Sequence, residues 1–175
     1  MTIIAMGRSL TGVLGAMTLL TLGGCATNPI PAGYTGPLSQ ISDTFTIDGN
    51  GAVDFFYLAK INGNTTDNAL VATLQANSGR GFSMNPVPFY RSVPAQTATF
   101  SIVGRTHYAA PILELTHKVY QVAGDVSFTP TAGHVYQVKG VLAADGSSVW
   151  IEDETGSVMD KRIELKNSAL GILQK

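Results

Sequence analysis

The fold of this chain is constrained most by short segments in which apolar and polar residues alternate. In residues 51–61, for example, Val53, Phe55 and Tyr57 fall on one face. Successive side chains of a β-strand point to opposite faces of a sheet, so a period of two is typical of a strand that buries one face. The segments that alternate in this way are residues 51–61, 97–105, 119–128, 134–142 and 147–154.

Turn residues separate these segments at short intervals. The clearest turn signals are Asn62–Asn64, Thr129–Gly133, Asp145–Gly146 and Thr155–Gly156. Residues 119–128, 134–142 and 147–154 are therefore expected to form consecutive antiparallel hairpins. Asp48–Gly51 is expected to turn between the first pair of strands.

Only residues 66–77 show a helical pattern, with Asp67 as a plausible N-cap and with Leu70, Thr73 and Leu74 on one face. A chain of 175 residues is most simply one domain. Charged residues make up 13% of it, well below the usual value of about 25%. We therefore predict an all-β fold, an antiparallel β-sandwich of immunoglobulin-like or transthyretin-like shape. It has about seven or eight strands and at most one short helix.

The N-terminal segment has the composition of a secretory signal peptide. Arg8 precedes an uncharged apolar run that extends to Gly24. The apolar part of this run is shorter than the about 20 residues that a membrane-spanning helix needs. We therefore predict a signal peptide over residues 1–24, which begins at Met1 or at Met6.

Cys25, the only cysteine, directly follows this segment. The sequence Leu-Gly-Gly-Cys that ends at Cys25 resembles the bacterial lipobox, whose cysteine is lipidated and becomes the first residue of the mature protein. Stable anchoring needs more than one acyl chain, each contributing about 0.8 kcal/mol per buried CH₂. The alternative is that Cys25 is an ordinary thiol, and in either case no intramolecular disulfide can form. Ala26 and Thr27 follow in place of Asp, which by the same resemblance implies sorting to the outer membrane.

Three prolines and two glycines mark the next segment, which is predicted to be an extended tether. Such a tether holds a domain up to about 45 Å from the lipid. The predicted organisation is a signal peptide over residues 1–24, the lipidated cysteine and tether over 25–43, and the β-sandwich over 44–175.

Segments spread along the mature chain resemble proteobacterial envelope lipoproteins with a small β-sandwich domain. The resemblance covers nearly the whole mature chain and implies export and lipid anchoring. It brings no assigned activity, cofactor or catalytic residue. The segments that carry it are GYTGP, DFFYL, NSGRGFSM, RSVPA, VGRTHYAAPI and GSSVWIEDETG.

Histidines are the first candidates for a metal site, and the chain has three, His107, His117 and His134. None belongs to a His-x-His or His-x-x-x-His pair. We predict no metal site and no cofactor, and a site assembled from distant strands is the alternative.

The acidic cluster Glu152, Asp153 and Glu154 lies beside a predicted turn. We interpret it as an exposed hairpin end that is kept polar. The alternative is a hydrolase in which Glu152 or Glu154 acts with a histidine. Because no nucleophile elbow, Walker loop or dinucleotide-binding motif occurs, the chain is not predicted to be an enzyme.

The most distinctive segment runs from residue 77 to residue 96, where Arg80 lies between two glycines that allow close backbone approach. Arg80, Phe82, Phe89, Tyr90 and Arg91 are of the types enriched in binding hot spots, and they form the predicted partner surface. The alternative is that the aromatic rings plug the end of the sandwich and that the arginines are solvated.

Residues 103–112 carry Arg105, His107 and Tyr108 away from a predicted strand end. These side chains form either a second part of the same surface or an ordinary crossing between sheets.

The sequence thus predicts a lipid-anchored envelope protein that binds or supports a partner, an envelope protein or a glycan. A net charge of −1 and scattered cations give no basic field for nucleic acid. The alternatives are a lipid-anchored hydrolase that acts on envelope polymers and a metal-handling periplasmic domain.

Overall fold

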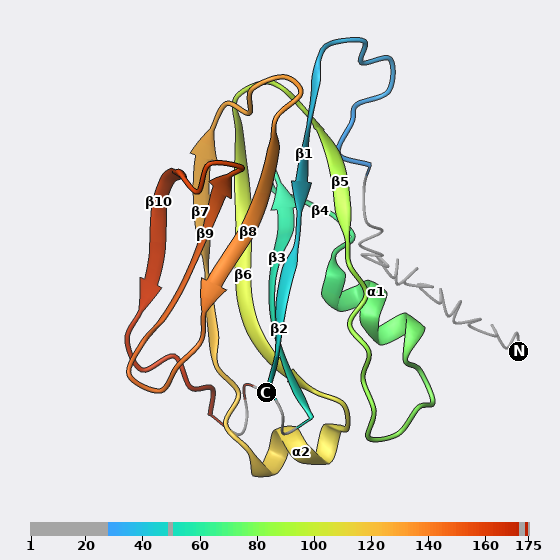
Figure 1. The fold of residues 1–175 in the computed structure, drawn as a ribbon, viewed down its shortest axis with the longest axis vertical. Coiled ribbons are helices and arrows are strands. Elements are labelled where there is room, and N and C mark those ends of the chain that lie inside the picture. The colour runs from blue at the N-terminus through green and yellow to red at the C-terminus, as the bar shows by residue number, and fades with distance from the viewer. Residues whose placement is uncertain (1–27, 49–50, 172–173, 175) are drawn as a thin grey trace, which may run out of the picture.

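Two β-sheets pack face to face in the computed structural model, which describes residues 28–48, 51–171 and 174 (Figure 1). Sheet A has the order β10 (Val158–Leu165), β9 (Ser147–Asp153), β8 (Val135–Val141), β1 (Leu38–Ser42) and β5 (Tyr90–Pro94). Sheet B has the order β2 (Thr44–Asp48), β3 (Ala52–Ile61), β6 (Ala98–Tyr108) and β7 (Gln121–Phe128), and β4 (Asn64–Thr65) also pairs with β3. The prediction of an all-β sandwich is confirmed, with ten strands in the described residues.

The core lies between the sheets and follows the alternation seen in the sequence. Phe56 and Leu58 of β3 and Phe100 of β6 meet Val138 and Ile151 of sheet A, and all five are buried. Full burial of such side chains contributes about 1.5–3 kcal/mol each. This core therefore supplies the main stabilisation of the sandwich.

The outer face of sheet B is also covered, because β3 is apolar on both faces. Val53 and Phe55 point away from the core and pack against Ala69 of helix α1 (Ala69–Ala76). Met84 and Phe89, from the loop that joins α1 to β5, also pack in this second apolar cluster. The two-sided apolar pattern of residues 52–58 thus places α1 and its loop on this face.

A buried aspartate marks the point where the chain passes from sheet A to sheet B. Asp43 lies between β1 and β2, and its carboxylate accepts hydrogen bonds from the backbone N–H groups of Leu58 at 3.0 Å and Ala69 at 2.8 Å. Both guanidinium nitrogens of Arg91 donate to the same carboxylate, at 3.0 and 2.7 Å. Burial raises the pKa of Asp43, while Arg91 and the two backbone N–H groups oppose that shift.

The predicted helical segment is confirmed as helix α1, but its N-cap and its buried face differ from the prediction. The N-cap is Asn68, whose Oδ1 accepts from Val71 N–H at 3.1 Å, rather than Asp67. Thr73 is buried and its hydroxyl accepts a hydrogen bond from Val87 N–H at 2.9 Å, whereas Leu74 is 42% exposed. The helical face predicted from Leu70, Thr73 and Leu74 is therefore only partly buried.

A second helix, α2 (Pro111–Thr116), corrects the expectation of at most one helix. It lies at one end of the sandwich, after β6 (Figure 1). Its six residues are too few to show a helical period, and its one sequence signal is the proline in the first turn.

The predicted run of consecutive hairpins is correct in part. The β2–β3 and β8–β9 pairs are antiparallel neighbours, as expected. The turn at Thr129–Gly133, however, carries the chain from β7 in sheet B to β8 in sheet A, so these two strands do not pair. Polar turn residues reverse the chain in either case, and they do not specify which sheet the next strand joins.

Strand β1 lies within the segment that was expected to be a tether. It pairs antiparallel with the edge strand β5 and parallel with β8, as an interior strand of sheet A. The β-sandwich therefore starts at Leu38 rather than at residue 44. None of the helices in the described part of the chain is long and apolar enough to cross a membrane.

Candidate functional site

The loop between α1 and β5 is held in shape by one side chain at its base. Asn77 Nδ2 donates to the carbonyl oxygens of Thr73 and Asn85, both at 2.8 Å, and Asn77 Oδ1 accepts from Asn85 N–H at 2.9 Å. Between these residues, Gly79 and Gly81 have positive φ angles of 80° and 66°. Such angles are rarely adopted by residues with a side chain, so the two glycines shape this loop.

The five residues of the predicted partner surface do not form one exposed surface. Phe82 and Tyr90 are 71% and 69% exposed, and Arg80 is also exposed. Phe89 is half-buried against the apolar cluster beside Phe55, and the Arg91 guanidinium lies 4.9 Å from its ring centre.

The structure corrects the placement of Arg91 on an exposed surface, because the Arg91 side chain is only 5% exposed and is paired with Asp43. A guanidinium that the Asp43 carboxylate already binds through two nitrogens is not available to an external partner. Arg91 therefore links β5 to Asp43, at the point where the chain passes from sheet A to sheet B.

The structure brings the end of α1 and the loop that follows it together with the end of β6 and the start of α2. We call the depression between them the outer-face groove, and its volume is about 370 Å³. The first segment contributes Leu74, Asn77, Ser78, Gly79, Gly81, Ser83 and Met84, and the second contributes His107, Tyr108, Ala109, Pro111 and Glu114. None of the five residues of the predicted partner surface lines this groove, whereas His107 and Tyr108 of the second segment do.

A histidine and a carboxylate meet in this groove. His107 Nδ1 lies 2.6 Å from Glu114 Oε1, and their side chains are 22% and 13% exposed. Arg105 Nη2 lies 4.0 Å from Glu114 Oε2, and Arg105 Nη1 donates to Gln121 Oε1 at 2.8 Å. The cluster therefore combines one carboxylate, one guanidinium and one imidazole.

Burial lowers the pKa of His107 from its ordinary value of 6.5, the Glu114 carboxylate raises it, and the Arg105 guanidinium lowers it. The net direction favours the neutral ring. Because Nδ1 faces a carboxylate oxygen, the proton of the neutral ring belongs on Nδ1, and Nε2 keeps its lone pair. A neutral histidine of this kind accepts a hydrogen bond or a proton.

Glu114 is the residue of this site that the sequence did not indicate. It lies just beyond residues 103–112, which were interpreted as part of a surface or as a crossing between sheets, and no spacing relates it to His107. Only the proline at the start of α2 hinted at the helix that carries it.

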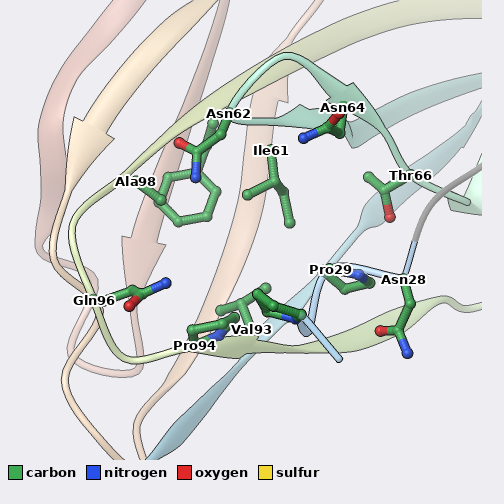
Figure 2. A pocket seen from close by; sticks show the side chains of 12 residues that line it. Asn28, Pro29, Ile61, Asn62, Asn64, Thr66, Val93, Pro94, Gln96 and Ala98 are labelled. Carbon is green, nitrogen blue, oxygen red and sulfur yellow. The ribbon is translucent and has the colours of Figure 1, made fainter. Parts of the chain in front are cut away.

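A second cavity, the end pocket, lies where the β3–β4 turn and the β5–β6 turn approach the N-terminal segment, and its volume is about 300 Å³ (Figure 2). Figure 2 shows Asn62 and Asn64 on one side of the cavity and Val93 and Pro94 on the opposite side. Asn28, Pro29 and Pro31 also line the cavity, so this part of the predicted tether lies against the domain.

The acidic cluster forms an exposed strand end rather than part of either cavity. Glu154 Oε1 lies 2.7 Å from His134 Nδ1, and both side chains are nearly half exposed. Glu152 accepts from Trp150 Nε1 at 2.8 Å and lies 3.4 Å from Lys139 Nζ.

Asp153 shapes the turn that follows β9. Its Oδ1 accepts from the Thr155 hydroxyl at 2.6 Å and from the backbone N–H groups of Thr155 and Ser157 at 2.9 Å. The Thr155 hydroxyl is the main cause of a pKa of Asp153 below its ordinary value.

In the part of the chain that the structure describes, no three histidine, cysteine, aspartate or glutamate side chains are grouped so that they could hold a metal ion. His107 and His134 each contact a single carboxylate, and His117 Nδ1 lies within hydrogen-bonding distance of the Thr116 hydroxyl. Cys25 lies outside the described residues.

No protein-family model, curated protein or solved structure matches this chain. The resemblance to envelope lipoproteins stays a prediction, and the groove is interpreted from its own geometry.

Proposed function

We propose that this chain is a lipid-anchored module of the bacterial cell envelope that binds a ligand in the outer-face groove. The observation that carries the binding role is the convergence of two chain segments around one groove of about 370 Å³. Ligand sites are typically concave, largely apolar and furnished with a few polar groups, and their volumes are about 300–1,000 Å³. The His107–Glu114 pair supplies such polar groups.

The proposed anchor is Cys25, which lies in a lipobox-like sequence and would be lipidated after export. The proposed location is the outer membrane. Asn28 follows three residues later and already lines the end pocket. Three residues span at most about 11 Å. A lipid on Cys25 would therefore hold the domain close against the membrane, rather than at the end of a tether of about 45 Å.

The anchor is tested by labelling cells with a palmitate analogue and fractionating them. We expect the label on the wild-type chain and its loss in Cys25→Ala, with the variant released from the membrane fraction. The matched control is Thr27→Ala, which keeps the cysteine and should stay labelled. An unlabelled wild-type chain, or a Cys25→Ala chain that fractionates like wild type, would count against the anchor.

The binding role is tested separately by capturing envelope components on the purified protein. A component that binds wild type and is lost when Leu74→Glu fills the groove mouth supports the site. Leu74 is partly exposed, so this change is expected to leave the fold intact.

A second candidate function, a hydrolase that acts on envelope polymers, is favoured by the same pair of side chains. His107 and Glu114 place an imidazole and a carboxylate in one concave site, which is the arrangement that orients a general base. Glu152 and Glu154 do not take part, since neither lines the groove. Release of soluble fragments from envelope polymers that disappears in His107→Ala would establish this activity, and its absence in wild type would exclude it.

A further inference from the structure

We propose that the outer-face groove binds a neutral oligosaccharide, with hydroxyl groups of the sugar donating hydrogen bonds to the carboxylate of Glu114. The inference rests on the proposed binding role of the groove and adds the chemical class of the ligand. It does not depend on the lipid anchor.

Glu114 is a hydrogen-bond acceptor whose capacity the protein does not fill. Its side chain is 13% exposed, and the buried oxygen Oε1 lies 2.6 Å from His107 Nδ1, so Oε1 is directed at the protein. Oε2 is 4.0 Å from Arg105, beyond hydrogen-bonding distance. Oε2 is therefore the oxygen that can accept hydrogen bonds from a ligand, and such bonds would stabilise this carboxylate.

The charges around the groove favour a neutral ligand. The negative charge of Glu114 lies beside the positive charge of Arg105, and His107 is held in its neutral form by burial. Arg80, the free cation of the neighbouring loop, does not line the groove. An anionic ligand would meet the Glu114 carboxylate, and a metal ion would find fewer than three ligands among the described residues.

The remaining lining suits the two kinds of surface that a sugar ring presents. Leu74, Met84 and Pro111 offer apolar contact to the C–H face of a ring. Ser78 and Ser83 offer hydroxyl groups that both donate and accept. A chain of neutral sugar units matches this lining. Its hydroxyl groups can donate to the carboxylate and exchange hydrogen bonds with the serine hydroxyls, and its C–H faces can pack on the apolar wall.

The test measures binding to the full-length protein, extracted in a detergent without a sugar headgroup, by ¹H–¹⁵N chemical-shift titration. The probes are neutral oligosaccharides of glucose, galactose, mannose and N-acetylglucosamine, an acidic set of uronic-acid oligosaccharides, and a mixed peptide library. We expect a neutral probe to shift resonances of the groove residues. Glu114→Gln should weaken this binding at least about tenfold, since hydrogen bonds to a charged group contribute about 1.5–3 kcal/mol. The matched control is Glu164→Gln on exposed β10, which should leave it unchanged.

Leu74→Ala provides a second variant in case Glu114→Gln alters folding, and it should weaken binding several-fold through loss of the apolar wall. Binding of neutral probes that both groove variants leave intact would overturn the inference. Binding of only acidic or peptide probes would overturn the sugar class while the binding role stands. If no probe binds, both the sugar class and the binding role are overturned, and palmitate labelling of the same preparation reports separately on the anchor.

Discussion

The Asp43–Arg91 pair gives the sharpest test of how this fold is held together. The Asp43 side chain is fully buried and accepts four hydrogen bonds, two from the Arg91 guanidinium and one each from Leu58 and Ala69. Asp43→Asn keeps the size of the side chain but removes its charge. It also places an amide NH₂ group, which donates, against N–H groups that donate to the Asp43 carboxylate in the wild-type protein. Arg91 would then be a buried cation without its counter-charge.

Removal of one partner of a buried ion pair costs about 3–5 kcal/mol. The whole free energy of unfolding of such a domain is about 5–15 kcal/mol. With a urea dependence of about 2 kcal/mol per molar, Asp43→Asn should lower the unfolding midpoint by about 2 M. The fluorescence of Trp150, the only tryptophan and 8% exposed, reports the transition.

The measurement uses a Cys25→Ala background, which removes the acceptor of the proposed lipid. Asp125→Asn, on the exposed face of β7, is the matched control and should cost less than about 0.5 kcal/mol. A cost below about 1 kcal/mol for Asp43→Asn would refute the assignment of this pair as the link between the sheets, α1 and β5.

Two further predictions follow from burial. Because burial lowers the pKa of His107 below 6.5, the unfolded chain takes up a proton on this ring before the folded chain does. The free energy of unfolding should therefore fall as the pH drops below about 6.5. Urea titrations at about pH 5 and about pH 7.5 measure this decrease, and His107→Gln should remove the part of it that His107 causes. Gly140→Ala would place a Cβ into the Phe56 ring and 2.6 Å from a backbone oxygen, which should cost about 1–3 kcal/mol by thermal or urea unfolding. Gly146→Ala, whose Cβ meets nothing closer than 3.8 Å, should cost less than about 1 kcal/mol, and equal costs for the two glycines would contradict the packing described.

The strands that bury one face could be predicted from the sequence, because burial of that face imposes a period of two. This holds for β6, in which Ala98, Phe100 and Ile102 are buried and the residues between them are partly exposed. It fails for β1, because Ser39 is buried although it is polar, so the alternation is not visible in the residue types. The prolines and glycines before β1 then favoured a tether.

The site could be predicted only in its parts. The glycines around Arg80 and the position of His107 near a strand end indicated two unusual segments, and local sequence carries that information. Their meeting in one groove depends on how α1 packs on sheet B, which is a long-range property. The same limit explains Arg91 and Asp43, since each appears as a surface residue until its partner 48 positions away is known.

The position of β1 between β8 and β5 has a consequence for the order in which the protein folds. Its two neighbours are β5 and β8, and the residue that pairs with Ile41 on the β8 side is Tyr136. The first strand of the domain therefore stays without one of its neighbours until most of the chain is present. Pairing over such sequence distances is slow, because the loop must close before the contacts can form. With the proposed export, sheet A would be completed only after the C-terminal half has crossed the membrane, and β1 would need protection from pairing with other chains during that interval.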